Sequence, residues 1–305
     1  MKQPNNHTAV VIALASIVIS GCSSSNDPVP QDVAINFAAQ VNGAGFTCGQ
    51  TYTGIGTTGS DFQVNDFRMY VHGVHIHDDA TGKQYPVELT QDGQWQLDDV
   101  AMLDFENSND SATCNGTPET NTVVKGKVTV PSNVDLSNTE VCFEVGVPAD
   151  KNHINEATAA SPLNASGMLW AWKVGRKYIR IDGVGDPNGV NNKFNLHLGA
   201  QGCPDGSATA PPSSACTASN TFEACVANFD VVNNVIAVDP APVLAANDVT
   251  VNLNGGTTAK PGCQSFVDDN DCEEIMPRLG LDYSYGRVSG TASVYSAGQV
   301  LIRKQ

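Results

Sequence analysis

The sequence predicts an all-β fold, an antiparallel β-sandwich stapled by disulfides in one domain. Three observations favour this class. Many short runs alternate apolar and polar residues, turn-forming glycine, asparagine and aspartate separate the runs, and eight cysteines follow an export-type N-terminus. Alternation with a period of two is typical of half-buried strands, and many short strands with turns between them form a sandwich or barrel. No fixed-period repeat occurs, and the length fits one domain.

The N-terminus predicts export and lipidation. Lys2 precedes an apolar run at 9–19, which is too short for a transmembrane helix. The run ends in I-V-I-S-G-C, which resembles a bacterial lipobox with Cys22 as the lipidated residue. Several acyl chains on one cysteine hold a protein to a membrane better than a single chain does. The alternative is a secretory signal without lipidation, in which the cysteine has no special role.

The predicted lipidation at Cys22 implies that the chain has three parts. We expect a lipoprotein signal peptide at 1–21, a lipidated polar tether at 22–32 and a folded domain at 33–305. Ser23 follows the lipidated cysteine, and in the lipoproteins that this sequence resembles a serine there favours the outer membrane, facing the periplasm. Apart from its lipid anchor, the protein is not expected to contact the membrane.

Alternating patterns place the strands. In the first run, Val33, Ile35 and Phe37 alternate with mostly polar neighbours, which indicates one buried face. Short helices are expected only at 243–247 and 273–279. The predicted strands are 33–41, 66–76, 85–89, 94–100, 123–130, 140–147, 177–181, 193–198, 228–238, 249–253 and 288–295.

The cysteines predict disulfides rather than metal thiolates, because their number is even in an exported chain and no C-x-x-C occurs. Proximity favours a Cys263–Cys272 bridge, Cys203 is expected to pair with Cys216 or Cys225, and a Cys48–Cys114 bridge would close a long loop. The segment 204–215 then becomes a stapled excursion. The predicted disulfide cysteines are Cys48, Cys114, Cys142, Cys203, Cys216, Cys225, Cys263 and Cys272.

The charge narrows the classes of partner. The net charge is −16 and becomes −17 when the signal peptide, which contains Lys2, is removed. A strongly acidic chain does not suit nucleic acid or an anionic lipid surface. It suits cations or a basic partner, and it equally suits an acidic surface that is only solvated.

Three histidines form the first candidate metal site. His72, His75 and His77 occur together in Y-V-H-G-V-H-I-H, and on a strand His75 and His77 share one face. Two imidazoles in that arrangement can bind a transition metal. The run ends in the turn D-D-A-T-G-K, so these histidines alternatively mark an exposed strand end.

Two further histidines form the second candidate. His153 follows a predicted strand in a loop, and His197 faces away from the apolar side of its strand, so it needs solvent or a partner. Met168, Trp170 and Trp172 lie two apart, a spacing that fits a packed core strand as well as a site. Two imidazoles beside a methionine and two tryptophans suit copper better than calcium or magnesium, which prefer oxygen ligands.

Catalytic motifs are missing. The sequence contains no G-x-S-x-G, H-E-x-x-H or phosphate-binding loop. The acidic segment 268–274 resembles a cation loop but lacks the glycine and spacing of an EF-hand, and a solvated loop closed by a disulfide explains it better.

Seven segments, in order along the chain, together resemble the MbnP-like copper-binding family, also called the metallo-mystery-pair four-Cys family. Their order and number carry the resemblance, because no single segment is specific. The segments are F-T-C-G-Q-T-Y at 46–52, D-F-R-M-Y-V at 66–71, V-A-M-L-D-F-E at 100–106, G-V-P-A-D-K-N-H with S-P-L-N within 146–164, M-L-W-A-W-K-V-G-R-K-Y at 168–178, H-L-G-A-Q-G-C at 197–203, and G-C-Q-S-F-V-D-D-N-D-C-E-E-I-M-P-R-L-G-L at 262–281.

The resemblance implies a periplasm-facing protein that binds copper, with His153 and His197 in motifs of the family and Met168 nearby. It also implies a dihaem cytochrome c peroxidase-like partner, related to MauG, that oxidises a tryptophan to kynurenine. Trp170 and Trp172 are the candidates, since both lie in the family's M-x-W-x-W motif. The cluster of His72, His75 and His77 departs from the pattern. Cys142 also departs from it, and is expected to pair with Cys216 or Cys225.

The sequence therefore predicts a copper-binding envelope lipoprotein in copper acquisition or handling, and not an enzyme. The first alternative is an envelope lipoprotein that binds a non-metal ligand or another protein, with purely structural histidines. The second is a copper oxidase or reductase that uses the same histidines.

Overall fold

The structure is a computed structural model that describes residues 27–78, 81–253, 260–283 and 298–305. The predicted signal peptide, Cys22 and the predicted strand 288–295 lie outside the described residues. Within the described ranges, no helix has both the length and the apolar character needed to cross a membrane.

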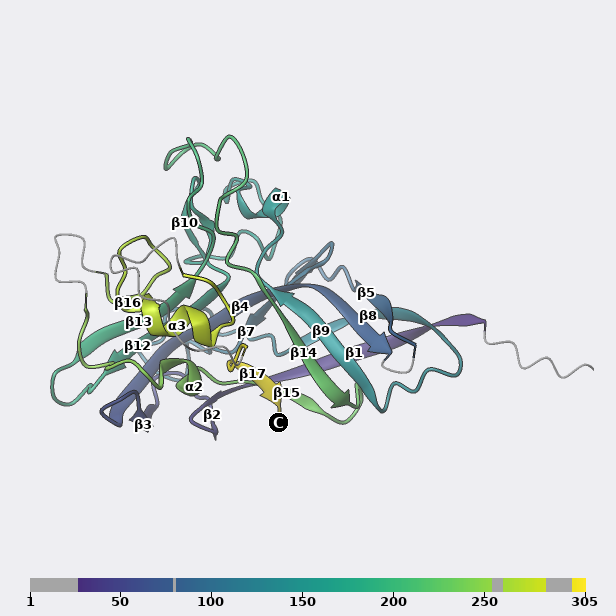
Figure 1. Ribbon diagram of the computed structural model, residues 1–305, viewed down its shortest axis with the longest axis horizontal. Helices are drawn as coiled ribbons and strands as arrows, with labels where there is room; N and C mark the ends of the chain where they lie inside the picture. Colours follow the sequence, from purple (N-terminus) through teal and green to yellow (C-terminus); the bar gives the residue numbers. More distant parts are fainter. Residues whose placement is uncertain (1–26, 79–80, 254–259, 284–297) are drawn as a thin grey trace, which may run out of the picture.

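Strands dominate the fold and the helices are short (Figure 1). The helices are α1 (Ala149–Asn152), α2 (Ala241–Leu244) and α3 (Cys272–Arg278). The strands are β1 (Pro28–Val41), β2 (Ala44–Gly45), β3 (Thr51–Ile55), β4 (Ser60–Asp78), β5 (Lys83–Leu89), β6 (Gln96–Leu97), β7 (Val100–Asp104), β8 (Val123–Pro131), β9 (Thr139–Val145), β10 (Leu169–Ala171), β11 (Gly175–Arg176), β12 (Ile179–Gly185), β13 (Asn192–Leu198), β14 (Phe222–Phe229), β15 (Val235–Val238), β16 (Gly262–Cys263) and β17 (Ile302–Lys304).

The main sheet curls into two facing halves, joined where the long strand β4 pairs with β5. One half holds β5, β8, β1, β15 and β17, and the other places β12, β7, β9 and β3 along β4. Phe37 of the first half contacts Phe143 of the second with ring centroids 5.4 Å apart, so the core lies between the halves. Pairing is antiparallel except for β1–β15 and β13–β16 among the described strands. The prediction of a single all-β domain is confirmed.

Alternating burial explains why these residues form strands. Along β8, every second residue is buried while its neighbours are exposed or half-buried. In β13, Phe194, Leu196 and Leu198 are 1%, 2% and 1% exposed and face the core as predicted. Burial of a leucine or phenylalanine side chain is worth about 1.5–3 kcal/mol relative to exposure. The core-facing residues therefore fix the register of each strand.

Several strand boundaries differ from the prediction. β1 begins at Pro28, so residues 28–32 of the predicted tether pair with β8. The predicted strand 228–238 divides into the end of β14, a turn and β15, because the Asp230 carboxylate accepts hydrogen bonds from the Val232 and Asn233 amides. Residues 249–253 form a turn, in which the Asp248 side chain accepts the Thr250 amide. Side-chain to backbone hydrogen bonds of this kind compete with strand pairing.

Four disulfides connect all eight cysteines of the described chain. The pairs are Cys48–Cys114, Cys142–Cys225, Cys203–Cys216 and Cys263–Cys272. The Cys48–Cys114 and Cys263–Cys272 predictions are confirmed, and of the two open choices Cys203 takes Cys216 and Cys142 takes Cys225. The excursion at 204–215 is thus closed at its base.

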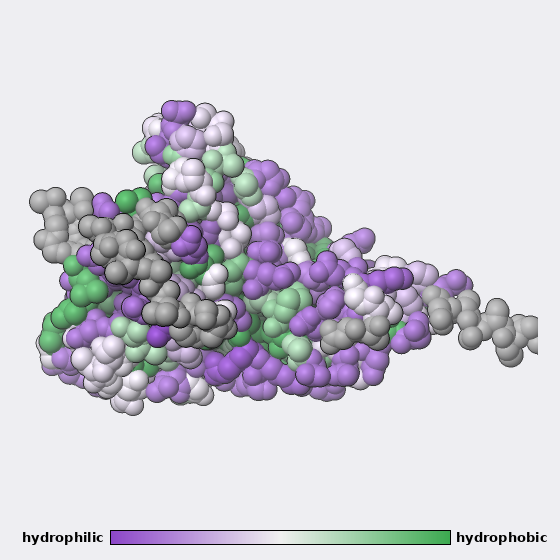
Figure 2. All heavy atoms as spheres, viewed as in Figure 1, coloured by the Kyte–Doolittle hydropathy of each residue, from purple (hydrophilic) through white to green (hydrophobic). Residues whose placement is uncertain are grey.

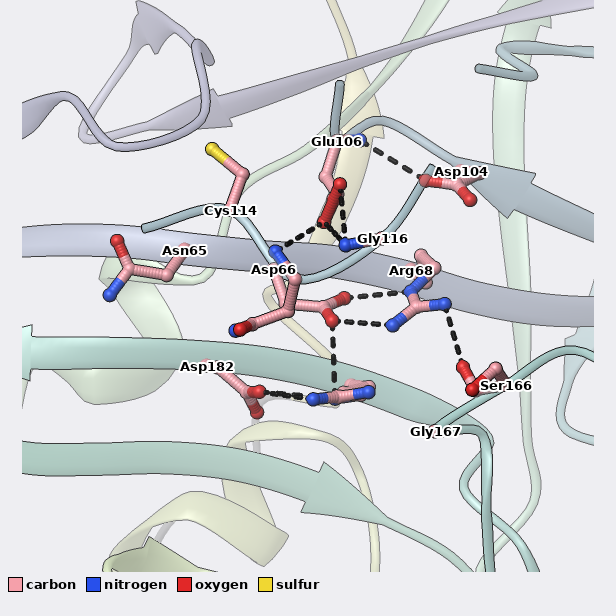
Figure 3. Close-up of polar contacts among 12 residues, drawn as sticks. Asn65, Asp66, Arg68, Asp104, Glu106, Cys114, Gly116, Ser166, Gly167 and Asp182 are labelled. Carbon is pink, nitrogen blue, oxygen red and sulfur yellow. Dashed lines mark hydrogen bonds and ion pairs between the residues drawn. The ribbon is translucent and has the colours of Figure 1, made fainter. Parts of the chain in front are cut away.

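A ladder of buried ion pairs crosses β4 and β12 (Figure 3). The antiparallel register places Asp66 opposite Asp182, and it places Arg68 opposite Arg180. Residues of like charge therefore lie opposite each other. The ion pairs form between an arginine and an aspartate of the same strand, and diagonally between the two strands. Arg68 donates to both oxygens of Asp66 at 2.8 and 2.5 Å. Arg180 Nε lies 3.2 Å from Asp66, and its Nη2 donates to Asp182 at 2.6 Å.

Two more acids extend the ladder toward the loop after β7. Asp104, which is 2% exposed, lies opposite Arg68 in the β4–β7 register. Glu106 is fully buried and accepts hydrogen bonds from the Asn115 and Gly116 amides (Figure 3). Burial raises the pKa of Asp104 to about 7, against the opposing effect of the Arg68 guanidinium. This carboxyl therefore holds a proton at a pH at which an exposed aspartate is ionised.

The disulfides differ in the length of chain that they close. Replacing Cys48 and Cys114 by alanine opens a loop of 66 residues and should lower the free energy of unfolding by about 4 kcal/mol in the chain-entropy account. The matched pair is Cys263→Ala with Cys272→Ala, which opens a loop of 9 residues and should cost about 2.5 kcal/mol. Guanidinium unfolding measures both. Equal losses, or the reverse order, would contradict the loop-length account.

The Asp104 carboxyl should make stability depend on pH. Because its pKa is about 7 when folded and near 3.8 when unfolded, the folded chain keeps a proton that the unfolded chain releases. The free energy of unfolding should therefore fall as pH rises from 5 to 8, by on the order of 2 kcal/mol from this group. In Asp104→Asn, which cannot ionise, this contribution should vanish in denaturant unfolding at the two pH values.

Asp32→Asn is the control, since Asp32 is an exposed carboxylate on β1 that pairs with Lys127. It should keep the pH dependence of the wild-type protein. If Asp104→Asn also keeps that dependence, the proposed protonation of Asp104 is wrong.

Candidate functional site

The two tryptophans of the M-x-W-x-W motif lie on a hairpin outside the main sheet. β10 and β11 pair only with each other, and β10 has three residues. The interpretation of this run as a core strand is therefore wrong, because the chain turns back at 172–175. Met168 is buried in the core at 1% exposure, whereas Trp170 and Trp172 are half-buried. In Figure 1, β10 and α1 project together from one side of the sheet.

Arg176 holds together the projecting lobe, which consists of α1, the loop that follows it and the β10–β11 hairpin. Its side chain is 0% exposed, and it has no carboxylate partner among the described residues. Its guanidinium instead donates to the carbonyl oxygens of Leu163, Lys151, Asn152 and Ile154. One side chain thus ties the loop after α1 and the loop before the hairpin to β11.

His153 and Trp172 bind each other's backbone. The indole Nε1 of Trp172 donates to the His153 carbonyl at 2.5 Å, and the His153 Nδ1 lies 3.1 Å from the Trp172 carbonyl. Since a carbonyl only accepts, Nδ1 carries the hydrogen and Nε2 keeps its lone pair. Asn152 Nδ2 lies 3.3 Å from that Nε2 and can donate to it. The contacts select the tautomer that binds a metal through Nε2.

His153 opens into a cavity of about 530 Å³ beneath the lobe, named here the His153 cavity. One wall comes from α1, one from the strand β4, and one from the excursion closed by Cys203–Cys216. Its lining residues are His72, Val147, Pro148, Ala149, Asp150, Asn152, His153, Tyr178, Ala200, Pro212, Ser214, Ala215, Cys216, Ser219 and Thr221. Of the five predicted metal-binding histidines, this cavity therefore brings together His72 and His153.

The donor atoms of the His153 cavity fit a transition metal. His72 Nε2 is buried and has no hydrogen-bond partner within the part of the chain that the structure describes, and burial lowers the pKa of His72 and of His153. Both imidazoles are therefore neutral at neutral pH, the form that coordinates a metal. The sulfurs of Cys203 and Cys216 lie within 4.8 Å of a His153 ring nitrogen. They are joined in a disulfide, so imidazole nitrogen is the available donor.

His197 and Trp170 form a separate group, and His197 does not line the cavity. The His197 Nε2 lies 2.5 Å from Asp182, which supplies the partner that the sequence required. Its Nδ1 is buried and has no hydrogen-bond partner among the described residues, and the same is true of the indole Nε1 of Trp170. The centroids of the two rings lie 6.2 Å apart. Burial lowers the pKa of Lys177, whose Nζ is 5.6 Å from the Trp170 ring, to about 8.

His75 and His77 face another part of the molecule. His75 Nδ1 bonds the Gly73 carbonyl at 3.0 Å, and His77 Nδ1 lies 2.7 Å from Glu140 of β9. Gly73 has φ 60°, a left-handed conformation that glycine adopts without strain, and the pairing of β4 with β9 is irregular there. This bulge separates His72, at the cavity, from His75 and His77.

Sequence reasoning missed the charged side chains that orient these groups. Neither Asp182 nor Arg176 belongs to a metal-binding or catalytic motif. The sequence signal for Asp182 is the mirrored pair of patterns D-x-R at 66–68 and R-x-D at 180–182. The acidic segment 268–274 serves structure. Asp269 and Asp271 are 3% and 1% exposed and accept backbone amides.

Comparisons with known proteins agree with this architecture. A family model described as MbnP matches residues 30–265. Among solved structures, MbnP from Methylosinus trichosporium is similar, with 28% sequence identity and a TM-score of 0.73 over 90% of this chain and 98% of that chain. No match was found among the curated proteins. Because the family match spans more than half of the sequence, this chain belongs to the MbnP family.

Proposed function

We propose that this protein binds copper in the His153 cavity and serves copper acquisition or handling at the cell envelope, held by a lipid on Cys22. The observation that carries the proposal is that His72 and His153 both line one cavity. Nε2 of His72 has no partner, and Nε2 of His153 keeps its lone pair. Membership of the MbnP family supports the same function.

The donor set suits copper better than a hard cation. Calcium and magnesium need several oxygen ligands, whereas imidazole nitrogen suits copper and zinc. Asp150 is the acidic residue among the described cavity-lining side chains, and it is exposed. The described lining contains no second carboxylate, and the other oxygen donors there are neutral side chains such as Ser214, Ser219 and Thr221. The proposed role is binding rather than catalysis, and two imidazole ligands at one cavity are compatible with it.

A dihaem cytochrome c peroxidase-like partner, related to MauG, is proposed to oxidise a tryptophan of the hairpin to kynurenine. Trp172 is the better candidate for altering the copper site, because it contacts His153. In this step dioxygen, or two equivalents of hydrogen peroxide used at the partner's haems, would cleave the indole C2–C3 bond to give N-formylkynurenine. Hydrolysis would then release formate and leave an aryl amine and a ketone, so new donors would lie beside His153. Trp170 is the second candidate and lies beside His197. Both side chains are half-buried, so electrons can leave them over a short path to the surface.

A non-metal ligand is the second candidate function. The volume of about 530 Å³ exceeds what one ion needs and lies within the range of small-molecule sites. Val147, Pro148 and Ala149 give the cavity an apolar wall. With a non-metal ligand in the cavity, His72 and His153 would have a structural role or would position that ligand.

Single substitutions separate the possible ligand pairs. The two possible ligand pairs are His153 with His72 and His153 with His197. His153→Ala should lower copper affinity on the order of 100-fold or more, since it removes a ligand of both pairs. His72→Ala should do the same if the second ligand is His72, whereas His197→Gln should lower affinity only if His197 is that ligand. Copper titration against a competing chelator measures the affinities.

We expect loss in His72→Ala and near-wild-type binding in His197→Gln, which keeps a donor toward Asp182. The reverse result would return the site to the pair His153 and His197. Unchanged affinity in all three variants, with circular dichroism showing a folded chain, would exclude copper binding by these histidines.

Mass spectrometry tests the proposed oxidation of tryptophan. Protein produced together with its dihaem partner should carry the tryptophan-to-kynurenine mass change on the peptide that holds Trp170 and Trp172. Fragmentation assigns the residue, and Trp172→Phe should abolish the change while Trp170→Phe keeps it. An unmodified peptide from copper-replete cells that contain the partner would remove the support for oxidation while leaving the copper titration unaffected.

A further inference from the structure

A second group of metal-ligating side chains lies on adjacent strands away from the His153 cavity. β9 pairs with β4 on one side and with β14 on the other (Figure 1). His75 of β4 lies opposite Cys142 of β9, and Cys142 lies opposite Cys225 of β14. Neither His75 nor its acidic neighbours line the cavity.

Strand alternation brings two carboxylates to the same face. Glu144 is two residues from Cys142, and Glu223 is two residues from Cys225, so all four side chains share one side of the sheet. Glu144 and Glu223 are directly paired across the strands. The Cys142–Cys225 disulfide fixes that register, and its sulfurs are committed to each other. Two like charges are thus held side by side on one outer face.

His75 completes the group. Its Nδ1 bonds the Gly73 carbonyl, so its Nε2 carries the lone pair, and this Nε2 is buried with no hydrogen-bond partner. It faces Glu223 Oε1 at 3.9 Å, so two acceptors point toward each other across a distance too long for a hydrogen bond. A cation between them would satisfy both.

Burial raises the pKa of Glu144, the charge of Glu223 raises it further, and His75 lowers it. The three groups therefore act on one another electrostatically. The face is also accessible, because Glu223 is 50% exposed while the His75 side chain is 14% exposed. An ion can enter from solvent on the Glu223 side without any movement of the sheet.

We propose that His75, Glu223 and Glu144 form a second metal site, which takes a divalent cation of the zinc type. His75 and Glu223 already lie within 4.8 Å of each other, and the Glu144 side chain has to turn toward them to become the third ligand. One imidazole nitrogen and two carboxylates then surround the doubly charged ion. Zinc accepts this mixed set with Zn–N and Zn–O bonds of about 2.0–2.2 Å. Around a tetrahedral ion the nitrogen and oxygen would lie about 3.4 Å apart, so Glu223 has to move by roughly half an ångström. Calcium would need more oxygens, and a soft monovalent copper ion prefers ligands without charge.

The test is zinc binding to the disulfide-intact protein by titration calorimetry, with zinc sulfate as the probe. Glu223→Gln and His75→Ala should each lower zinc affinity by about tenfold to 100-fold or more. Glu223→Gln preserves the shape of an exposed side chain, so its folding is not in question. Glu88→Gln, which changes an exposed carboxylate on β5, is the matched control and should bind zinc as the wild type does.

His153→Ala provides the second comparison, because it disables the cavity and leaves this face intact. Zinc affinity should survive in it, and the zinc-edge anomalous signal should lie between His75 Nε2 and Glu223. Loss of zinc binding in His153→Ala with retention in His75→Ala would place the ion in the cavity and overturn the proposal. Unchanged affinity in both His75→Ala and Glu223→Gln, or no binding by the wild type, would overturn it as well.

Discussion

The buried ion pairs between β4 and β12 are the interaction on which the positions of the candidate groups depend. Asp66 has no exposed surface and is held by two guanidinium groups, so neither strand can slip without leaving a charge unpaired in the core. Removing one partner of a buried pair typically costs about 3–5 kcal/mol. The ladder also reaches outward. Arg68 donates to the Ser166 carbonyl at the foot of the hairpin, and Asp182 orients the ring of His197. The ladder therefore connects the scaffold to the start of the hairpin and to the ring of His197, which packs against Trp170.

The hairpin gives its two tryptophans different surroundings. Trp172 exchanges hydrogen bonds with the backbone of His153 at the cavity, whereas Trp170 packs between His197 and Phe266 with its indole N–H unsatisfied. Gly199 lies under Trp170, where an added Cβ would come 2.4 Å from the ring, so only glycine allows this packing. Figure 2 shows a projecting lobe of mixed hydropathy above a surface that is largely hydrophilic, in keeping with the net charge of −16. The two tryptophans, although separated by only one residue in the sequence, therefore have different neighbours and different hydrogen bonding.

The sequence predicted much of the scaffold and less of the site, for physical reasons. Alternation follows from burial of one strand face, so β8 and β13 appeared where expected, and proximity decided Cys263–Cys272. The cavity could not be predicted, because it forms where a helix, a strand and a stapled loop meet from distant parts of the chain. The bulge at Gly73 breaks the period that made His72, His75 and His77 look like one cluster. The sequence left a core strand open for the hairpin, because aromatic residues at every second position suit both a buried strand and a short exposed hairpin.

Arg176 carries a consequence for how an ion would enter the site. Its guanidinium donates hydrogen bonds to four backbone carbonyls, so the cavity wall that holds His153 is fixed before any ligand binds. A preformed site loses little chain entropy on binding, so more of the coordination energy appears as affinity. Association would then be limited by the removal of water from the incoming ion, rather than by the closing of a loop. Under the proposed function, uptake and release of the ion would need no rearrangement of the fold.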